Sequence, residues 1–139
     1  MIFHKFSLFL FFFFVFEIDA NVVTYFKFIE DITCRHQRYW YYKIYYYEKD
    51  FGLNPNDYLG TTGKHNFVRE NYERFTMITP QDGDASTLYQ IIADLYHNCT
   101  KDSSEDYEEL HLGYWPTQPV INTIKICKVL DEPGVKCED

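Results

Sequence analysis

One stretch decides the fold class of this chain: Arg38-Tyr39-Trp40-Tyr41-Tyr42-Lys43-Ile44-Tyr45-Tyr46-Tyr47. Aromatic and β-branched residues favour β-strands because their bulk fits a pleated, half-buried surface. Alternate residues of a strand point to opposite faces, so the sequence predicts an inner face formed by Tyr42, Ile44 and Tyr46. The other residues then form an outer face, on which tyrosine hydroxyls stay in water: Tyr41, Lys43, Tyr45 and Tyr47.

Further strands are predicted on both sides of this stretch. Their composition and punctuation indicate strands at residues 22–29, 66–70, 107–114 and 120–130. Turn residues predict breaks at residues 51–57, 60–63 and 79–84. Residues 88–99 fit two patterns, a helix with Leu88, Ile91, Ile92 and Leu95 on one side, or a strand. As a strand, this segment has one face formed by Tyr89, Ile91, Ala93, Leu95 and His97. About seven strands without linkers or repeats predict an all-β fold, a β-sandwich of two sheets.

The first residues are typical of a secretory signal peptide rather than of the domain. His4 and Lys5 precede an apolar run at residues 6–16, and Ala20 supplies a small residue for cleavage. The run is too short to span a bilayer, which needs roughly 20 apolar residues. We therefore expect a signal peptide at residues 1–20, a single domain at residues 21–139, and a secreted, extracellular protein that is not an integral membrane protein once processed.

The charge of the chain excludes one class of partner, and its cysteine content agrees with export. Removing residues 1–20 leaves 12 basic and 19 acidic residues, and a negative surface repels phosphate backbones, so nucleic acid is not an expected partner. Cysteines in an exported chain read as disulfides. We expect the four cysteines to form two disulfides, and three pairings are possible. The cysteines are Cys34, Cys99, Cys127 and Cys137.

Three short motifs stand out along the chain: the segment Leu95-Tyr96-His97-Asn98-Cys99, the loop Asp57-Tyr58-Leu59-Gly60, and Gly63 followed by Phe67. These motifs resemble those of the nematode transthyretin-like family of small secreted proteins. The strand at residues 38–47 precedes these motifs and Cys137 follows them, in the same order as the corresponding features of the family. The resemblance implies a transthyretin-like (prealbumin-like) sandwich. The family's disulfide pairing is not carried over, because the turn after Cys34 differs and Cys127 is unusual.

Catalytic and metal sites are not predicted by the sequence. Relatives that hydrolyse purine breakdown products end in Tyr-Arg-Gly-Ser, whereas this chain ends in Lys136-Cys137-Glu138-Asp139. His97 and Cys99 lie two apart, but a cysteine in an exported protein is expected to be oxidised. The remaining histidines lack metal-ligand spacing. We expect no enzyme activity, no cofactor and no metal.

Two features point to other sites. Asn98-Cys99-Thr100 fits the N-glycosylation pattern, with a polar turn as the alternative. The tyrosine-rich strand is either a binding surface or a cover for the sandwich. We expect an extracellular binding or carrier module for a small hydrophobic ligand or a protein partner. The alternatives are an adaptor that bridges exposed phospholipid and a cell-surface receptor through Arg35, Arg38 and Lys43, or a secreted effector that binds a host protein.

Overall fold

The computed structural model describes residues 23–50, 55–68, 72–82, 87–132 and 134. The described residues form seven strands: β1 (Val23–Thr33), β2 (Trp40–Glu48), β3 (Asp57–Val68), β4 (Tyr72–Asp82), β5 (Leu88–His97), β6 (Asp106–Pro116) and β7 (Ile121–Val129). Among the described residues, no helix is long and apolar enough to cross a membrane. The predicted all-β class and the number of strands are confirmed; the predicted signal peptide lies outside the described residues.

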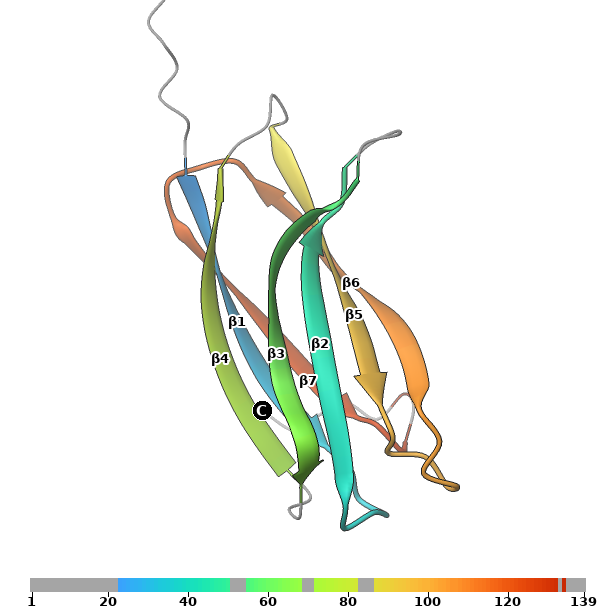
Figure 1. The fold of residues 1–139 in the computed structure, drawn as a ribbon. Helices are drawn as coiled ribbons and strands as arrows, with labels where there is room; N and C mark the ends of the chain where they lie inside the picture. Colours follow the sequence, from blue (N-terminus) through green and yellow to red (C-terminus); the bar gives the residue numbers. More distant parts are fainter. Residues whose placement is uncertain (1–22, 51–54, 69–71, 83–86, 133, 135–139) are drawn as a thin grey trace, which may run out of the picture.

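The strands form two sheets that face each other (Figure 1). One sheet has the order β4-β1-β7 and the other the order β3-β2-β5-β6. β1 pairs with β7 in parallel, and all other neighbouring strands pair antiparallel. In the constant-type immunoglobulin sandwich, the first, second, fourth and fifth strands share a sheet. Here the first strand shares its sheet with the fourth and the seventh, so the topology is a different one.

Alternation along the two central strands builds the core between the sheets. Every second residue of β1 and β2 is buried, whereas the residues between them are mostly half-buried. Phe28 of β1 stacks on Tyr46 of β2 across the two sheets, with ring centroids 3.9 Å apart. Burying a large apolar side chain contributes about 1.5–3 kcal/mol, so these facing rows hold the two sheets together. The predicted inward set on β2, which contains Tyr42, Ile44 and Tyr46, is confirmed.

The segment at residues 88–99, whose sequence fitted both a helix and a strand, contains strand β5. It pairs with β2 on one side and with β6 on the other. Its inward face is buried as the strand pattern predicted: Tyr89, Ile91, Ala93, Leu95 and His97. Ile92 is buried as well as its neighbour Ile91, and the pairing with β6 shifts register between them; this break in the alternation explains why the apolar pattern also fitted a helix.

Two predicted breaks were wrong, and both fall in edge strands. Residues 60–63 lie inside β3 and pair with β2 in continuous register, although the register shifts on either side of them, and Gly63 has a φ of 102°. Glycine adopts such angles without strain, so a strand continues through a position that reads as a turn. Pro80 lies inside β4 and pairs with Tyr25 of β1. Because β4 is the edge of its sheet, proline is tolerated there.

Candidate functional site

The outer face of the four-stranded sheet carries a group of tyrosine side chains. Along β2, the outward residues are half-buried, and they are those predicted from the sequence: Tyr41, Lys43, Tyr45 and Tyr47. Their inward neighbours are buried in the core. The prediction of an outer tyrosine row is confirmed as geometry.

Strand register extends this row across the neighbouring strands. Tyr45 lies opposite Asp94 of β5, and Lys43 lies opposite Tyr96. Tyr96 in turn lies opposite Tyr107 of β6. On the other side of β2, Tyr47 lies opposite Tyr58 of β3. We define the tyrosine face by these residues: Tyr41, Lys43, Tyr45, Tyr47, Tyr58, Asp94, Tyr96 and Tyr107.

The rings of this face contact one another. The Tyr45 and Tyr96 rings lie 5.9 Å apart at 90°, and the Tyr96 and Tyr107 rings lie 5.0 Å apart at 44°. Tyr47 contacts Tyr58 with centroids 5.8 Å apart. Edge-to-face and tilted pairs at these distances are the favoured geometries of aromatic pairs. The rings therefore restrict one another and form an ordered platform on the sheet.

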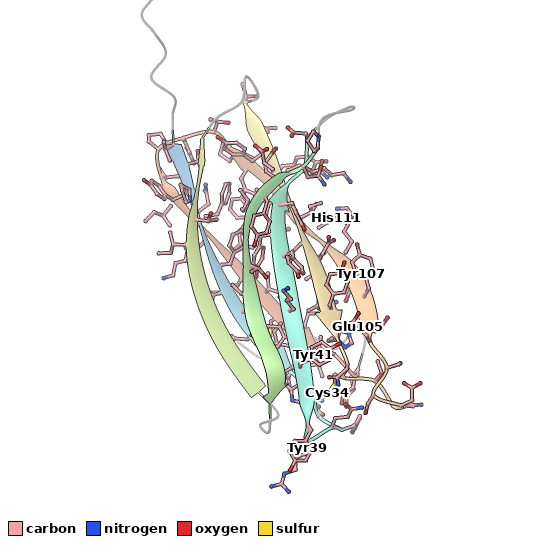
Figure 2. All side chains as sticks on the ribbon, viewed as in Figure 1. Cys34, Tyr39, Tyr41, Glu105, Tyr107 and His111 are labelled. Atoms are coloured by element: carbon pink, nitrogen blue, oxygen red, sulfur yellow. A yellow bond between two sulfur atoms is a disulfide. The ribbon has the colours of Figure 1, made fainter. Side chains whose placement is uncertain are left out.

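Charged groups are set among the rings. The Lys43 Nζ atom lies 4.1 Å from the centre of the Tyr45 ring. Tyr107 donates a hydrogen bond from its hydroxyl to Asp94 Oδ1 at 2.9 Å, and this bond raises the pKa of Tyr107 to about 12. Tyr41 donates to Glu105, which raises its pKa as well. Both hydroxyls therefore keep their protons at neutral pH. Figure 2 shows Tyr41 on β2, with Tyr107 and His111 on β6.

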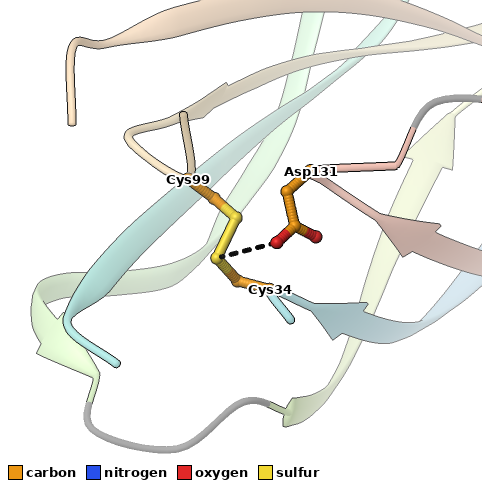
Figure 3. Close-up of side chains that lie close together, drawn as sticks. All are labelled: Cys34, Cys99 and Asp131. Carbon is orange, nitrogen blue, oxygen red and sulfur yellow. Dashed lines mark hydrogen bonds between the residues drawn. A yellow bond between two sulfur atoms is a disulfide. The ribbon is translucent and has the colours of Figure 1, made fainter. Parts of the chain in front are cut away.

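A disulfide joins the two sheets at one end of the sandwich (Figure 3). Cys34 follows β1 and Cys99 follows β5, and their sulfurs are bonded. The Asp131 carboxylate lies beside them and accepts hydrogen bonds from the backbone N–H groups of Arg35 and His36, at 3.1 and 2.5 Å. The sequence left the pairing open, because the ends of β1 and β5 are brought together only by the packing of the sheets. Cys127 is also disulfide-bonded, and Cys137 lies outside the described residues.

A cavity of about 410 Å³, lined by both polar and apolar groups, lies at this end. The residues that line it are His36, Gln37, His97, Cys99, Thr100, Lys101, Asp106, Leu130 and Asp131. His97 is buried, and its Nδ1 atom has no hydrogen-bond partner among the described residues. Burial lowers the pKa of His97, and the carboxylates of Asp106 and Glu108 oppose this only in part. The imidazole is therefore neutral at neutral pH. The sequence showed His36 and His97 as scattered, and the fold brings both to one cavity.

Two groups of described residues have side chains close enough to share a metal ion. The first consists of Cys34, Cys99 and Asp131, but its sulfurs form the disulfide and have no thiolate to offer. The second consists of the carboxylates of Glu48, Asp50 and Asp57, where β2 ends and β3 begins. Carboxylate oxygens suit hard cations such as calcium. We assign no ligand to this acidic group.

Asn98, the predicted glycosylation site, is buried. The side-chain Oδ1 atom of Asn98 accepts a hydrogen bond from the backbone N–H of Tyr41 at 2.8 Å. The backbone N–H of Asn98 donates to the carbonyl of Tyr41 at 3.3 Å. The residue thus continues the contact between β2 and β5 just beyond the last ladder pair. This geometry fits the alternative interpretation of a polar turn that ends the strand.

A carboxyl group lies in the core, between the sheets. Glu30 of β1 is fully buried, and its Oε1 atom accepts hydrogen bonds from the hydroxyls of Tyr46 at 2.5 Å and of Thr62. Its Oε2 atom is buried without a hydrogen-bond partner among the described residues. Burial raises the pKa of Glu30, although the surrounding hydroxyl groups lower it in part. The sequence analysis did not find this residue, because one acidic residue within an apolar strand carries no motif.

Comparison with known proteins gave one match. Searches of curated proteins and of solved structures found no match. A family model described as "Caenorhabditis elegans protein of unknown function (DUF870)" matches residues 30–119. This range begins within β1 and ends after β6, so it contains the disulfide and the whole tyrosine face. The chain therefore belongs to this nematode family.

Proposed function

We propose that this chain is a secreted, non-enzymatic binding protein with a transthyretin-like sandwich, which engages a protein partner through the tyrosine face. The observation that carries the proposal is the continuity of this face across four strands. Tyr58 and Tyr107 are 57% and 50% exposed, and the rings between them are half-buried and packed against one another.

Such a surface is suited to protein recognition. Tyrosine is enriched in the centres of protein interfaces, because it supplies a large, amphipathic contact area at low cost in side-chain entropy. The ring contacts described above lower that cost further, since the side chains are already ordered before a partner arrives. The alternative role, a cover for the sandwich, is filled by the inward row of β2, which is buried beneath this face.

Export and the transthyretin-like identity are supported by separate features. The signal pattern at residues 1–20 and the Cys34–Cys99 disulfide both favour an oxidising compartment. The motif Leu95-Tyr96-His97-Asn98-Cys99 lies at the end of strand β5, as the matching motif lies at a strand end in the resembling family. Disulfide bonding also removes the thiolate that a cysteine hydrolase would need beside His97.

The adaptor and carrier alternatives fit the geometry less well. Each member of the basic cluster expected to meet anionic lipid has a neighbour within the chain: Arg35 forms an ion pair with Glu132 at 2.7 Å, Arg38 lies over Tyr39, and Lys43 lies over Tyr45. Asp94 also places a carboxylate within the tyrosine face, which repels anionic head groups. A carrier for a small hydrophobic ligand needs a cavity lined mainly by apolar side chains, whereas the cavity beside the disulfide combines Leu130 and Cys99 with two histidines, a lysine and two aspartates.

Paired tyrosine variants test the proposal. The wild-type protein and the Tyr41→Ala/Tyr45→Ala variant are immobilised and exposed to nematode extracellular fluid, with Tyr25→Ala as the control. Tyr25 is 42% exposed and belongs to the other sheet, so its loss removes an exposed ring without touching the face. We expect the control to retain the partners of the wild type and the double variant to lose them at unchanged thermal stability. Equal retention by all three proteins contradicts the proposal, as does loss of the fold in the double variant.

A further inference from the structure

We propose that the tyrosine face recognises cationic side chains, and that its partner is a protein segment rich in arginine. This inference rests on the proposed function and specifies the chemistry of the partner. It is carried by the arrangement of one carboxylate, three tyrosine rings and one lysine on strands β2, β5 and β6. The partner's guanidinium groups would lie between Asp94 and the rings of Tyr45, Tyr96 and Tyr107.

Asp94 has the position of an anchor for such a group. It lies between Tyr45 on one neighbouring strand and Glu109 on the other. The hydroxyl of Tyr107 donates to its Oδ1 atom, which fixes the direction of the carboxylate. A carboxylate offers about four lone-pair positions, so one bond from Tyr107 leaves capacity for the paired N–H groups of a guanidinium.

The rings around Asp94 attract cations through their faces. Lys43 shows this within the chain, because its ammonium group lies 4.1 Å from the centre of the Tyr45 ring. Cations within about 6 Å of an aromatic ring centre gain attraction from the ring quadrupole. Tyr96 and Tyr107 lie 5.0 Å apart and tilted by 44°, which opens an angle between two ring faces. Arginine suits this setting better than lysine, because its planar group stacks on rings and binds carboxylates in a fork.

The charges of the face favour a basic partner over the other occupants. Asp94 and the bordering acids Glu105 and Glu109 outnumber Lys43, and His111 beside Glu109 is charged only when protonated. A second copy of this chain would bring the same acidic face, and the formal net charge of the chain is −8. Anionic membranes are repelled for the same reason. Complementary potentials of this kind select partners and speed their encounter.

A peptide titration tests the inference directly. The probe is a short arginine-rich peptide, and its control is the same peptide with citrulline in place of arginine, which keeps the shape and removes the charge. Binding is followed by backbone amide shifts in nuclear magnetic resonance spectra. We expect the arginine peptide to shift amides of β2, β5 and β6, to leave those of β1 and β7 in place, and to bind more weakly as salt is added. The citrulline peptide is expected not to bind.

Matched variants separate the face from the general acidity of the protein. Asp94→Asn and Glu132→Gln each remove one negative charge, but only Asp94 lies on the face. We expect Asp94→Asn to weaken binding about fivefold and Glu132→Gln less than about twofold. Tyr96→Ala is expected to weaken it about twofold to fivefold, whereas Tyr25→Ala leaves it unchanged. Asparagine still accepts the hydrogen bond of Tyr107, so Asp94→Asn keeps the fold.

Several outcomes overturn the inference. Equal weakening by Asp94→Asn and Glu132→Gln shows attraction to an acidic surface in general. Equal binding of the citrulline peptide shows an aromatic contact without charge recognition. Binding to phosphatidylserine vesicles, or concentration-dependent dimers that bury the face, identifies another occupant. If the arginine peptide fails while the double tyrosine variant still loses its extracellular partner, only this inference falls, and the proposed function stands.

Discussion

Replacing Glu30 by glutamine tests how the core of this protein tolerates its buried carboxyl group. Glu30 is fully buried between the sheets, with Tyr46 and Thr62 donating to Oε1 and no partner for Oε2 among the described residues. Burial penalises the charged form, so the pKa of Glu30 in the folded protein lies above its ordinary value of 4.5. The hydroxyl groups oppose this rise without cancelling it.

The direction of the pH dependence follows from this rise in pKa. Below about pH 4.5 the carboxyl group is protonated in both the folded and the unfolded chain. As the pH rises, the unfolded chain releases the proton while the folded protein still holds it. The free energy of unfolding therefore falls by about 1.4 kcal/mol for each pH unit until the pH passes the pKa of the folded state. The contribution of Glu30 to stability is present in acid and is lost towards neutral pH.

Glutamine removes this dependence and keeps most of the contacts. Its amide oxygen accepts the same hydrogen bonds from Tyr46 and Thr62, whereas its NH₂ group replaces Oε2 at a buried position without a partner. An unsatisfied buried polar group costs about 1–3 kcal/mol, and the protonated carboxyl group of the wild type carries a similar cost. The two proteins should thus be about equally stable in acid. Above about pH 4.5, the Glu30→Gln variant should become more stable than the wild type. The gain should be about 1.4 kcal/mol for each unit by which burial raises the pKa of Glu30.

Urea unfolding of both proteins across the acid-to-neutral range measures the difference. Glu132→Gln serves as the control, because it removes a carboxylate from an exposed ion pair and leaves the buried carboxyl group of Glu30 in place. A difference between wild type and Glu30→Gln that stays constant over the whole range refutes the reasoning. It would mean that the hydroxyl groups cancel the effect of burial, so that the pKa of Glu30 is the same in the folded and the unfolded chain.

Three further predictions concern single features of the fold. Replacing Cys34 and Cys99 by alanine opens a loop with a sequence separation of 65. Chain entropy predicts a loss of about 4 kcal/mol in the free energy of unfolding, measured by urea titration. A loss below about 1 kcal/mol would contradict a stabilising role for this disulfide. Gly63→Ala should cost about 1–3 kcal/mol, because φ is 102° and a Cβ atom would lie 2.6 Å from the carbonyl oxygen of Tyr42; an unchanged melting temperature contradicts it. Asn98 should carry no glycan in the secreted protein, because its side chain is buried and bonded to the backbone, and a mass shift on glycosidase treatment would show the opposite.

Much of the local structure was predictable from the sequence. The alternation in residues 40–48 fixed which side chains of β2 face the core, because a strand has a period of two and one face of a sheet must be dry. The predicted strand boundaries were wrong in edge strands, because these strands tolerate residues that usually break a strand, such as Gly63 and Pro80. Residues 88–99 stayed ambiguous because periodicity over a short apolar segment does not separate a helix from a strand.

The sequence by itself determined an all-β chain with an outer tyrosine row on one strand, because these properties depend on neighbours along the chain. Only the tertiary structure decided which strands share a sheet, since sheet order depends on contacts between distant segments. That order places Asp94 and Tyr107 beside Tyr45 and Tyr96, pairs Cys34 with Cys99, and seals Glu30 between the sheets. The candidate site is therefore a product of strand pairing, because its side chains come from four strands that meet only in the folded protein.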